Sequence, residues 1–258
     1  MSVIRTVTKR FRPIFINLQS CNVSTGTFED DFHKNHVEIN TFQRSILTVG
    51  SAALSILDPY RGDMIACLSE TTGFNALKGM HQKMLDSTEG YEILKTRPRI
   101  NTKTIDLEYL KKLPEGTLGK TYSEFLVKNN VTPDSRMTVE FIDDIELAYV
   151  IQRYREAHDI FHTVLGMPTH MLGEVTVKWV EAIQTKLPMC ISGAIFGPIR
   201  LKPKHRKLYI DHYLPWAIET GKNMNFLLNI YFEKRWEQPM SELCSEINLI
   251  PFDSSTLK

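Results

Sequence analysis

Two histidines and two carboxylates gather in one short stretch of this chain. His158, Asp159 and His162 form an HDxxH motif, and Glu174 follows after eleven intervening residues. Histidines four residues apart lie on one face of a helix, close enough to bind one metal ion. The spacing therefore predicts a metal site with imidazole nitrogen and carboxylate oxygen as ligands, and with His158, Asp159, His162 and Glu174 as the candidates.

The motif falls in the strongest helical pattern of the chain. We expect this helix over residues 142–165, and both histidines continue its apolar stripe, so they should point toward the core. Gly166 and Pro168 end the helix, and a second helix over residues 171–186 carries Glu174 in its first part. All four side chains can then converge on one ion, or one carboxylate can accept the outer N–H of a histidine.

Other interpretations of the motif remain open. The zincin protease motif is HExxH, whereas the shorter Asp159 stands here beside the first histidine. Metal phosphohydrolases with a His-Asp doublet draw ligands from distant helices, for which His81 and Asp211 are available. Buried core histidines with local hydrogen bonds are the non-functional alternative. We favour a metal because buried polar groups need partners and these could share one.

The ligand types leave the metal and its role undecided. Nitrogen and oxygen donors suit Zn²⁺, and two histidines with a carboxylate also suit Fe²⁺. Four protein ligands would indicate a closed structural site, whereas catalysis requires an open or exchangeable position.

The remainder of the chain predicts a mainly helical protein. Strand signals are weak, so we expect an all-α fold, a single irregular multi-helix bundle. Loops are expected at residues 97–99 and 113–119, and Glu89-Gly90 is expected to separate two helices. The other helices are expected at residues 41–57, 60–69, 74–85, 121–128, 207–220, 223–236 and 241–247.

The ends of the chain differ in composition from the rest. Residues 1–28 contain four bases and no acid, which is typical of a mitochondrial presequence, with a disordered basic tail as the alternative. Residues 29–41 are polar and are expected to form a linker. We expect the helical domain over residues 42–250 and a short tail over residues 251–258. The four bases are Arg5, Lys9, Arg10 and Arg12.

Composition excludes several classes of protein. The net charge of +1 argues against binding to nucleic acid, and four dispersed cysteines form neither a thiolate zinc site nor a disulfide framework. The chain lacks a run of about 18 apolar residues, so any membrane association should be peripheral. The apolar segment 187–199 could pack in the core, line a lipid channel or rest on a membrane. A basic run at residues 200–207 follows it and would be attracted to anionic lipid.

Several motifs resemble one known family. They are LDPYRGDMIA at residues 57–66, ETTG at 70–73, RPRI at 97–100, HDIFH at 158–162 with Gly166, Gly173 and Glu174, and YFEKRW at 231–236. Together they resemble the Coq-four family of ubiquinone (coenzyme Q) biosynthesis proteins over residues 42–247.

The resemblance implies a location, a reaction and partners. Members are helical proteins held peripherally on the matrix side of the mitochondrial inner membrane, within a multi-protein ubiquinone-synthesis complex. The implied reaction removes the C1 carboxylate of 4-hydroxy-3-methoxy-5-polyprenylbenzoate and leaves a 2-methoxy-6-polyprenylphenol. The implied metal is zinc, bound by His158, Asp159, His162 and Glu174.

The leading hypothesis is therefore a metal-dependent C1 decarboxylase. Asp159 or Glu174 could protonate the ring carbon, and iron would be the better metal if oxygen takes part. Polar contacts to substrate could come from Arg61, Asp63 and Glu70, which could equally form a structural salt-bridge cluster. The alternative function is a non-catalytic lipid-binding scaffold with a structural metal, and a metal hydrolase is the third hypothesis.

Overall fold

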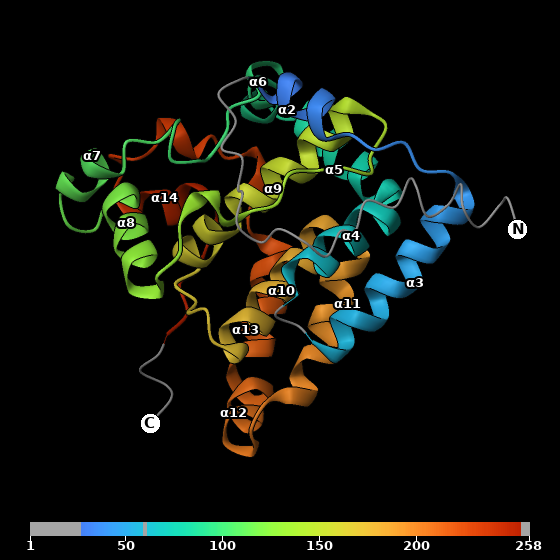
Figure 1. The fold of residues 1–258 in the computed structure, drawn as a ribbon. Coiled ribbons are helices and arrows are strands. Elements are labelled where there is room, and N and C mark those ends of the chain that lie inside the picture. The colour runs from blue at the N-terminus through green and yellow to red at the C-terminus, as the bar shows by residue number, and fades with distance from the viewer. Residues whose placement is uncertain (1–26, 59–60, 254–258) are drawn as a thin grey trace, which may run out of the picture.

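The computed structural model describes residues 27–58 and 61–253, and over these residues the protein is helical. Within this part of the chain no β-strand forms, and one isolated bridge joins Thr117 to Pro239. The predicted all-α multi-helix bundle is confirmed (Figure 1). None of the described helices is long and apolar enough to cross a membrane. Nearly all of the expected presequence lies outside the described residues.

The helices follow one another with short connections. Their bounds are α2 Phe28–Asn35, α3 Thr41–Leu57, α4 Gly62–Thr72, α5 Phe74–Leu85, α6 Thr88–Thr96, α7 Leu107–Lys112, α8 Leu118–Asn129, α9 Ile145–Val164, α10 Met171–Thr185, α11 Pro188–Phe196, α12 Pro203–Leu208, α13 Leu214–Asn223 and α14 Met240–Glu246. Short 3₁₀ turns lie at Pro133–Ser135, Gly197–Arg200, Leu227–Asn229 and Phe232–Lys234, and a π-helical turn spans Tyr209–Tyr213.

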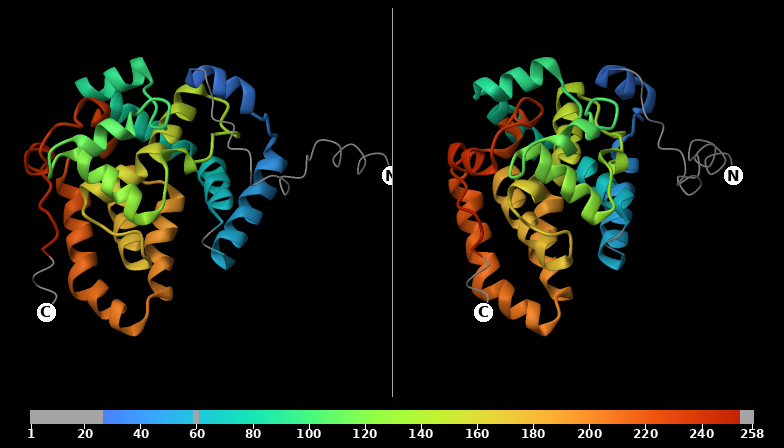
Figure 2. Two further views of the ribbon diagram at one scale, coloured as in Figure 1. Left: turned by 60° about the vertical axis from the view of Figure 1, so that its left-hand side comes forward. Right: turned by 90° about the vertical axis from the view of Figure 1, so that its left-hand side faces the viewer.

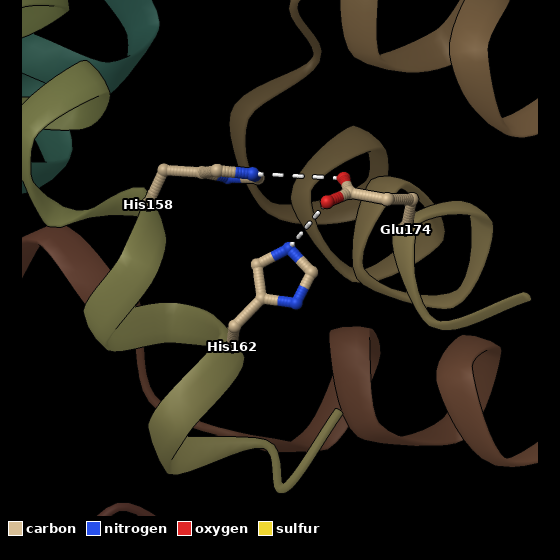
Figure 3. Close-up of side chains that lie close together, drawn as sticks. All are labelled: His158, His162 and Glu174. Atoms are coloured by element: carbon tan, nitrogen blue, oxygen red, sulfur yellow. Dashed lines mark ion pairs between the residues drawn. The ribbon is translucent and has the colours of Figure 1, made fainter. Parts of the chain in front are cut away.

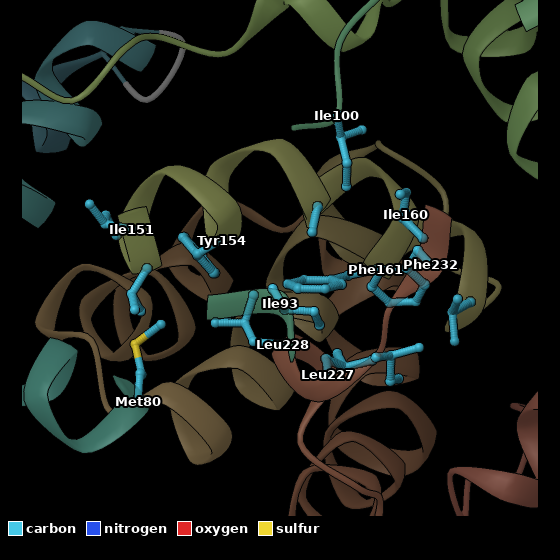
Figure 4. Packing of buried hydrophobic residues seen from close by; sticks show 14 of the residues in the cluster. Met80, Ile93, Ile100, Ile151, Tyr154, Ile160, Phe161, Leu227, Leu228 and Phe232 are labelled. Atoms are coloured by element: carbon cyan, nitrogen blue, oxygen red, sulfur yellow. The ribbon is translucent and has the colours of Figure 1, made fainter. Parts of the chain in front are cut away.

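Helix α9 is the axis of the bundle. Every residue from Leu147 to Val164 is buried, because α2, α5, α6, α8 and α10 all contact this helix. The side chain of Asp144 caps its first turn by accepting from two backbone N–H groups. Figure 4 shows the apolar packing beneath it, where Phe161 lies near Phe232 with ring centroids 6.2 Å apart. The helix predicted to carry the metal motif is thus the best-fixed element of the fold.

Helix α10 links α9 to the C-terminal helices of the bundle. Helix α10 packs against α11 and α13, and α11 contacts α4. Helices α3 and α4 pack closely on each other at the edge of the molecule, as Figures 1 and 2 show.

The structure places a helix where a linker was expected. Residues 29–41 include most of α2, whose Phe28 and Phe32 are buried against the core. Thr27 and Asp30 cap its first turn reciprocally, so the polar composition of this stretch reflects a capped helix rather than a flexible connection. The helical body therefore begins before residue 42.

The prediction of a helix over residues 223–236 is wrong. This stretch contains only two 3₁₀ turns between extended residues. Its backbone N–H groups find side-chain acceptors instead of helical ones: the N–H of Leu227 donates to Gln184 (3.1 Å) and that of Tyr231 donates to Glu89 (2.7 Å). The apolar residues that suggested a helix are buried individually under α6 and α9.

Other differences concern glycines and short helices. Glu89-Gly90 does not separate two helices but lies inside α6, where a Cβ on Gly90 would approach the carbonyl oxygen of Met84 to 2.5 Å. Helix α8 begins at Leu118, inside the loop expected over residues 113–119. The helix expected over residues 207–220 is interrupted by the π-helical turn, which joins α12 to α13.

Candidate metal centre

Three of the four predicted ligands meet in the structure. His158 and His162 project from α9 toward Glu174 in the first turn of α10, as Figure 3 shows. One ligand atom from each lies within 4.8 Å of the others. The carboxylate reaches both rings, with 3.8 Å from Oε2 to His158 Nε2 and 3.4 Å from Oε1 to His162 Nε2.

The turn between α9 and α10 sets this geometry. Gly166 adopts a φ of 64°, and the N–H of Met167 returns to the carbonyl of His162 at 2.9 Å. Gly173 then approaches the turn so closely that a Cβ there would lie 1.9 Å from the carbonyl oxygen of Pro168. Only glycine fits at this position, and the close approach places the next residue, Glu174, opposite the histidines.

The outer nitrogens of both histidines face acceptors. His158 Nδ1 lies 2.6 Å from the Glu181 carboxylate, and His162 Nδ1 lies 3.1 Å from the backbone carbonyl of Met167. Because these partners can only accept, we assign the N–H to Nδ1 on both rings. In the neutral rings both Nε2 atoms therefore present lone pairs toward Glu174.

Lone pairs that face a carboxylate require a cation between them. His162 Nε2 is buried and has no hydrogen-bond partner, which is costly unless a proton or a metal ion is present. Two imidazoles oriented by outer acceptors, with one carboxylate, form the arrangement that proteins use for divalent metals. The residues present thus fit a metal ion, and the side chain of Glu174 keeps 35% exposure toward solvent.

The charges around the site favour a positive charge at His158 and ionised carboxylates at Glu174 and Glu181. Burial raises the pKa of Glu181, but the charges of Lys178 and His158 outweigh it and leave the pKa below its usual value. Burial and Lys178 lower the pKa of His158, whereas Glu181 and Glu174 raise it, with a net rise. Burial raises the pKa of Glu174, but the two adjacent imidazoles outweigh it and leave the pKa well below its usual value.

Glu181 was not predicted from the sequence. It is fully buried and also accepts from Lys178 Nζ (2.6 Å) and from the Tyr154 hydroxyl (2.8 Å). A signal was present, since Glu181 follows Glu174 by seven residues and so lies on the same face of α10, two turns further on. The neighbouring Cys190 is no nucleophile, because burial raises the pKa of its thiol to about 12.

Asp159 lies apart from the three converging residues. Asp159 follows His158 by one residue and so points about 100° away around α9. Its Oδ1 pairs with the guanidinium of Arg136, and its buried Oδ2 has no hydrogen-bond partner. The structure therefore does not bring this carboxylate into the group of His158, His162 and Glu174. Its roles as fourth ligand and as acid remain predictions.

The three residues expected to contact substrate occupy two other places. Arg61 and Asp63 form an ion pair of 2.6 Å at the start of α4. Glu70 is buried at the other end of α4, where it accepts from Arg155 (2.6 Å) and from the backbone N–H groups of Glu140 and Phe141. None of them belongs to the metal group, and Glu70 joins α4 to α9.

The residues considered for a phosphohydrolase site also lie elsewhere. His81 faces Glu146 at 4.0 Å, and Asp211 pairs with Lys207 at 3.0 Å. A surface pocket of about 720 Å³ is lined by Glu89, Glu92, Tyr109, Tyr231 and residues 233–238, and none of the metal residues lines it.

Comparison with known proteins identifies a family and a similar fold. The family model "Coenzyme Q (ubiquinone) biosynthesis protein Coq4" matches residues 33–253. The chain also matches the crystal structure of a candidate ubiquinone biosynthesis protein from Nostoc punctiforme, with a TM-score of 0.63 and 19% identity, over 81% of this chain and 97% of that one. At this identity the match shows the fold alone.

Several curated relatives are much more similar in sequence. Proteins named "Ubiquinone biosynthesis protein COQ4 homolog, mitochondrial" are 58% identical in Bombyx mori, over 87% of this chain and 86% of the relative, and 54% identical in Aedes aegypti, over 86% and 81%. With the match of the family model over most of its length, this chain belongs to the Coenzyme Q (ubiquinone) biosynthesis protein Coq4 family.

Proposed function

We propose that this protein acts in ubiquinone biosynthesis as a metal-dependent decarboxylase. The substrate would be 4-hydroxy-3-methoxy-5-polyprenylbenzoate and the product a 2-methoxy-6-polyprenylphenol. The observation that carries the proposal is the pair of Nε2 lone pairs directed at one partly exposed carboxylate, since this arrangement calls for a cation beside solvent. Membership of the family supports the pathway.

The chain supplies ligands and their orientation. His158, His162 and Glu174 would hold the ion, with Zn²⁺ favoured and Fe²⁺ the alternative. When bound, the cation would supply positive charge to a substrate carboxylate or ring oxygen. Glu181 and the carbonyl of Met167 fix the two rings, so that the ligand atoms need little reorganisation on binding.

The reaction also requires a proton at the ring carbon. Breaking the bond between C1 and the carboxylate releases CO₂ and leaves an electron pair on C1, which must be protonated. Glu174 could pass a proton from solvent when it is released from the metal, because its side chain lies at the site and is one-third exposed. Asp159, buried and paired with Arg136, is the second candidate for this role.

The setting of the reaction is part of the proposal. The curated relatives are named mitochondrial. We place this protein peripherally on the matrix side of the inner membrane, with other ubiquinone-biosynthesis proteins as partners. A polyprenylated substrate is itself lipid-soluble, so we expect the enzyme to meet it at the bilayer surface.

A turnover assay tests the proposal directly. The purified, metal-loaded full chain would be incubated with a short-tailed prenyl hydroxybenzoate in detergent, and CO₂ and the phenol would be measured. We expect turnover by the wild type and none by Glu174→Ala. The matched control is Glu242→Ala, which removes another first-turn glutamate, in α14, and should leave turnover unchanged.

Metal analysis and anaerobic assays complete the design. Bound metal should be stoichiometric in the wild type and lost in His162→Ala. Dependence of turnover on oxygen would favour Fe²⁺ over Zn²⁺. A wild type that binds metal and prenyl lipid but turns nothing over, with oxygen present or absent, would reject catalysis and favour the non-catalytic scaffold.

A further inference from the structure

Helix α3 turns its apolar stripe away from the protein. Phe42, Ile46, Val49, Ala53 and Ile56 recur at steps of three and four residues, and all of them are exposed. Leu57, at the end of the helix, is 78% exposed. Surface helices normally bury this stripe against the core and present charges to water. In α3 the arrangement is inverted, so the stripe must face an apolar environment other than this core.

The polar side chains on the inner side of α3 form hydrogen bonds within the helix and need no water. Ser51 is its one buried residue, and it lies on the side that packs on α4. The hydroxyls of Thr48, Ser51 and Ser55 donate to carbonyls of their own helix at 2.8, 3.2 and 2.7 Å. From Ser45 to Leu57 the helix carries no charge. The whole segment can therefore enter a nonpolar medium without leaving unsatisfied polar side chains.

A second exposed apolar surface continues the stripe. Ile195 and Phe196 at the end of α11, and Ile199 in the following turn, are more than half exposed. The guanidinium of Arg200 donates to the carbonyl of Ile56 and so ties this turn to the end of α3. In Figures 1 and 2 the end of α3, α11 and α12 all lie toward the lower end of the molecule. We call this surface, formed by Val49, Ile56, Leu57, Ile195, Phe196 and Ile199, the α3–α11 face.

Basic side chains border the α3–α11 face. Residues 200–207 contain five Lys or Arg residues, and Lys202 and Lys204 are exposed. In the described part of the chain only one of the five, Lys207, forms an ion pair with an acidic side chain. An apolar surface with a cationic border complements a bilayer whose headgroups are anionic. A protein partner or a second copy of the chain would account for the apolar residues but not for this border.

The same segment rests on the turn that carries Glu174. Leu172 and Val175 pack with Leu201 and Tyr209 in a small cluster separate from the main core. Val175 also meets Gly197 so closely that a Cβ there would lie 2.6 Å from its Cγ2. Glu174 lies between Leu172 and Val175 in the sequence, so the α3–α11 face and the metal centre share one structural support.

We propose that the α3–α11 face is the surface by which the protein lies on an anionic lipid bilayer. Helix α3, about 25 Å long, would lie in the plane of the interface with its stripe toward the acyl chains. The bases of residues 200–207 would contact the headgroup phosphates. The inference rests on the proposed function for its purpose, the delivery of a lipid-soluble substrate, but its physical basis is independent of catalysis.

Vesicle sedimentation tests the surface. The probes are vesicles of phosphatidylcholine alone and of phosphatidylcholine mixed with phosphatidylglycerol. We expect the full chain to bind the anionic vesicles more tightly, and less tightly at high salt. Removing two bases in Lys202→Gln/Lys204→Gln should weaken partition by about 25-fold, or about fivefold per base. Val49→Ser/Ile56→Ser should weaken it by tenfold or more, because two apolar side chains no longer enter the acyl region.

Matched variants control for exposure and charge. Val127 on α8 is 70% exposed, and Lys95 and Lys128 are exposed bases on α6 and α8. Val127→Ser and Lys95→Gln/Lys128→Gln should bind vesicles as the wild type does. Circular dichroism of every variant would confirm that each is folded.

A depth measurement distinguishes insertion from adsorption. In Ile56→Trp the new indole should be quenched by lipids with brominated acyl chains, beyond the quenching of the native tryptophans. In Val127→Trp no additional quenching is expected. Equal quenching of the two variants, or equal binding by the α3 variant and its control, would overturn the proposal.

Two further outcomes would also reject it. One is a dimer in lipid-free solution that Val49→Ser/Ile56→Ser dissociates, because the face would then be covered by a second copy. The other is vesicle binding that depends on neither charge nor the stripe. Turnover of the short-tailed substrate in detergent should survive all the surface variants. Failure of the surface and failure of the decarboxylase are therefore separate results.

Discussion

Helices α9 and α3 are opposite in where they place polar and apolar side chains. Helix α9 is buried on all sides and carries histidines, acids and arginines inward, whereas α3 lies at the edge and carries its apolar residues outward. The buried charges of α9 have partners from other elements: Arg155 binds Glu70 of α4, and Arg153 binds Glu233. Within the described part of the chain, the exposed apolar residues of α3 belong to neither hydrophobic cluster.

The contrast separates contacts that the folded chain makes with itself from contacts that it makes with another surface. A buried charge persists only if the fold supplies its partner, so the ion pairs of α9 mark contacts that the folded chain already makes. An exposed apolar stripe persists at the cost of contact with water, so the stripe of α3 marks a contact that the chain makes with something else. Substitutions should therefore affect stability at α9 and association at α3.

The largest effect is expected where α9 depends on a buried partner. Glu70→Ala removes the carboxylate that pairs with the buried Arg155 and that accepts from two backbone N–H groups, and it should lower the free energy of unfolding by about 3–5 kcal/mol. Urea denaturation measures this. Arg61→Ala breaks an ion pair with Asp63 that is screened by solvent, so it should change the free energy of unfolding far less than Glu70→Ala does. If Arg61→Ala instead raises KM for the substrate without changing stability, Arg61 contacts substrate as the sequence suggested.

A smaller effect is expected behind the metal ligands. Glu181→Gln removes the negative charge that orients His158, and it should weaken metal binding by about 10–100-fold. Competition with a chelator of known affinity measures the change. Glu233→Gln, which removes a carboxylate charge that is likewise paired with a buried base, should leave metal affinity unchanged. Equal losses in the two variants would show that Glu181 acts through general stability alone.

The pH dependence of stability should reveal the cation between the histidines and Glu174. The folded pKa of His158 is raised above its ordinary value of 6.5, so its protonated form contributes stability below pH 6.5 that is lost as pH rises through the folded pKa. The lowered pKa values of Glu174 and Glu181 act only in acid, below their ordinary value of 4.5. The metal-free protein should thus lose stability above pH 6.5.

Added metal should reverse this trend. Metal binding requires deprotonated imidazoles, so the stabilisation by Zn²⁺ should grow with pH over the same range. Unfolding midpoints measured with chelator and with Zn²⁺ compare the two cases. His158→Gln should flatten both profiles, and a wild-type profile that Zn²⁺ leaves unchanged would argue against a metal at this site.

The smallest effect on stability is expected at α3. Ile56→Ser exposes no cavity and breaks no contact with the core, so the free energy of unfolding should change by no more than about 0.5 kcal/mol. Urea denaturation in the absence of lipid measures this. A loss of several kcal/mol would mean that the stripe is packed within the protein, and the contrast with α9 would disappear.

The sequence predicted those features that depend on local spacing. The HDxxH motif and the period of α9 define a helical face directly, so the helix, its buried histidines and the return to Glu174 were all predictable. The bounds of α3 and α5 were predictable for the same reason. A period does not reveal which side the core occupies, and the stripe of α3 therefore gave no indication that it faces outward.

Features that depend on distant partners could not be predicted. The turns of residues 223–236 exist because Gln184 and Glu89 accept their backbone N–H groups, and neither side chain is near in sequence. The position of Asp159 depends on Arg136, which comes from an irregular segment before α9. Glu181 became recognisable only once α10 was placed against His158.

Gly173 carries no functional group, yet it decides whether the metal centre can be assembled. A single methyl group at this position would collide with Pro168 and push the start of α10 away from α9. In a survey of variants, position 173 should therefore behave like a ligand, tolerating no substitution, although it touches neither metal nor substrate. Any attempt to transplant the site onto another helical scaffold must copy this spacer together with the three side chains that it brings into reach.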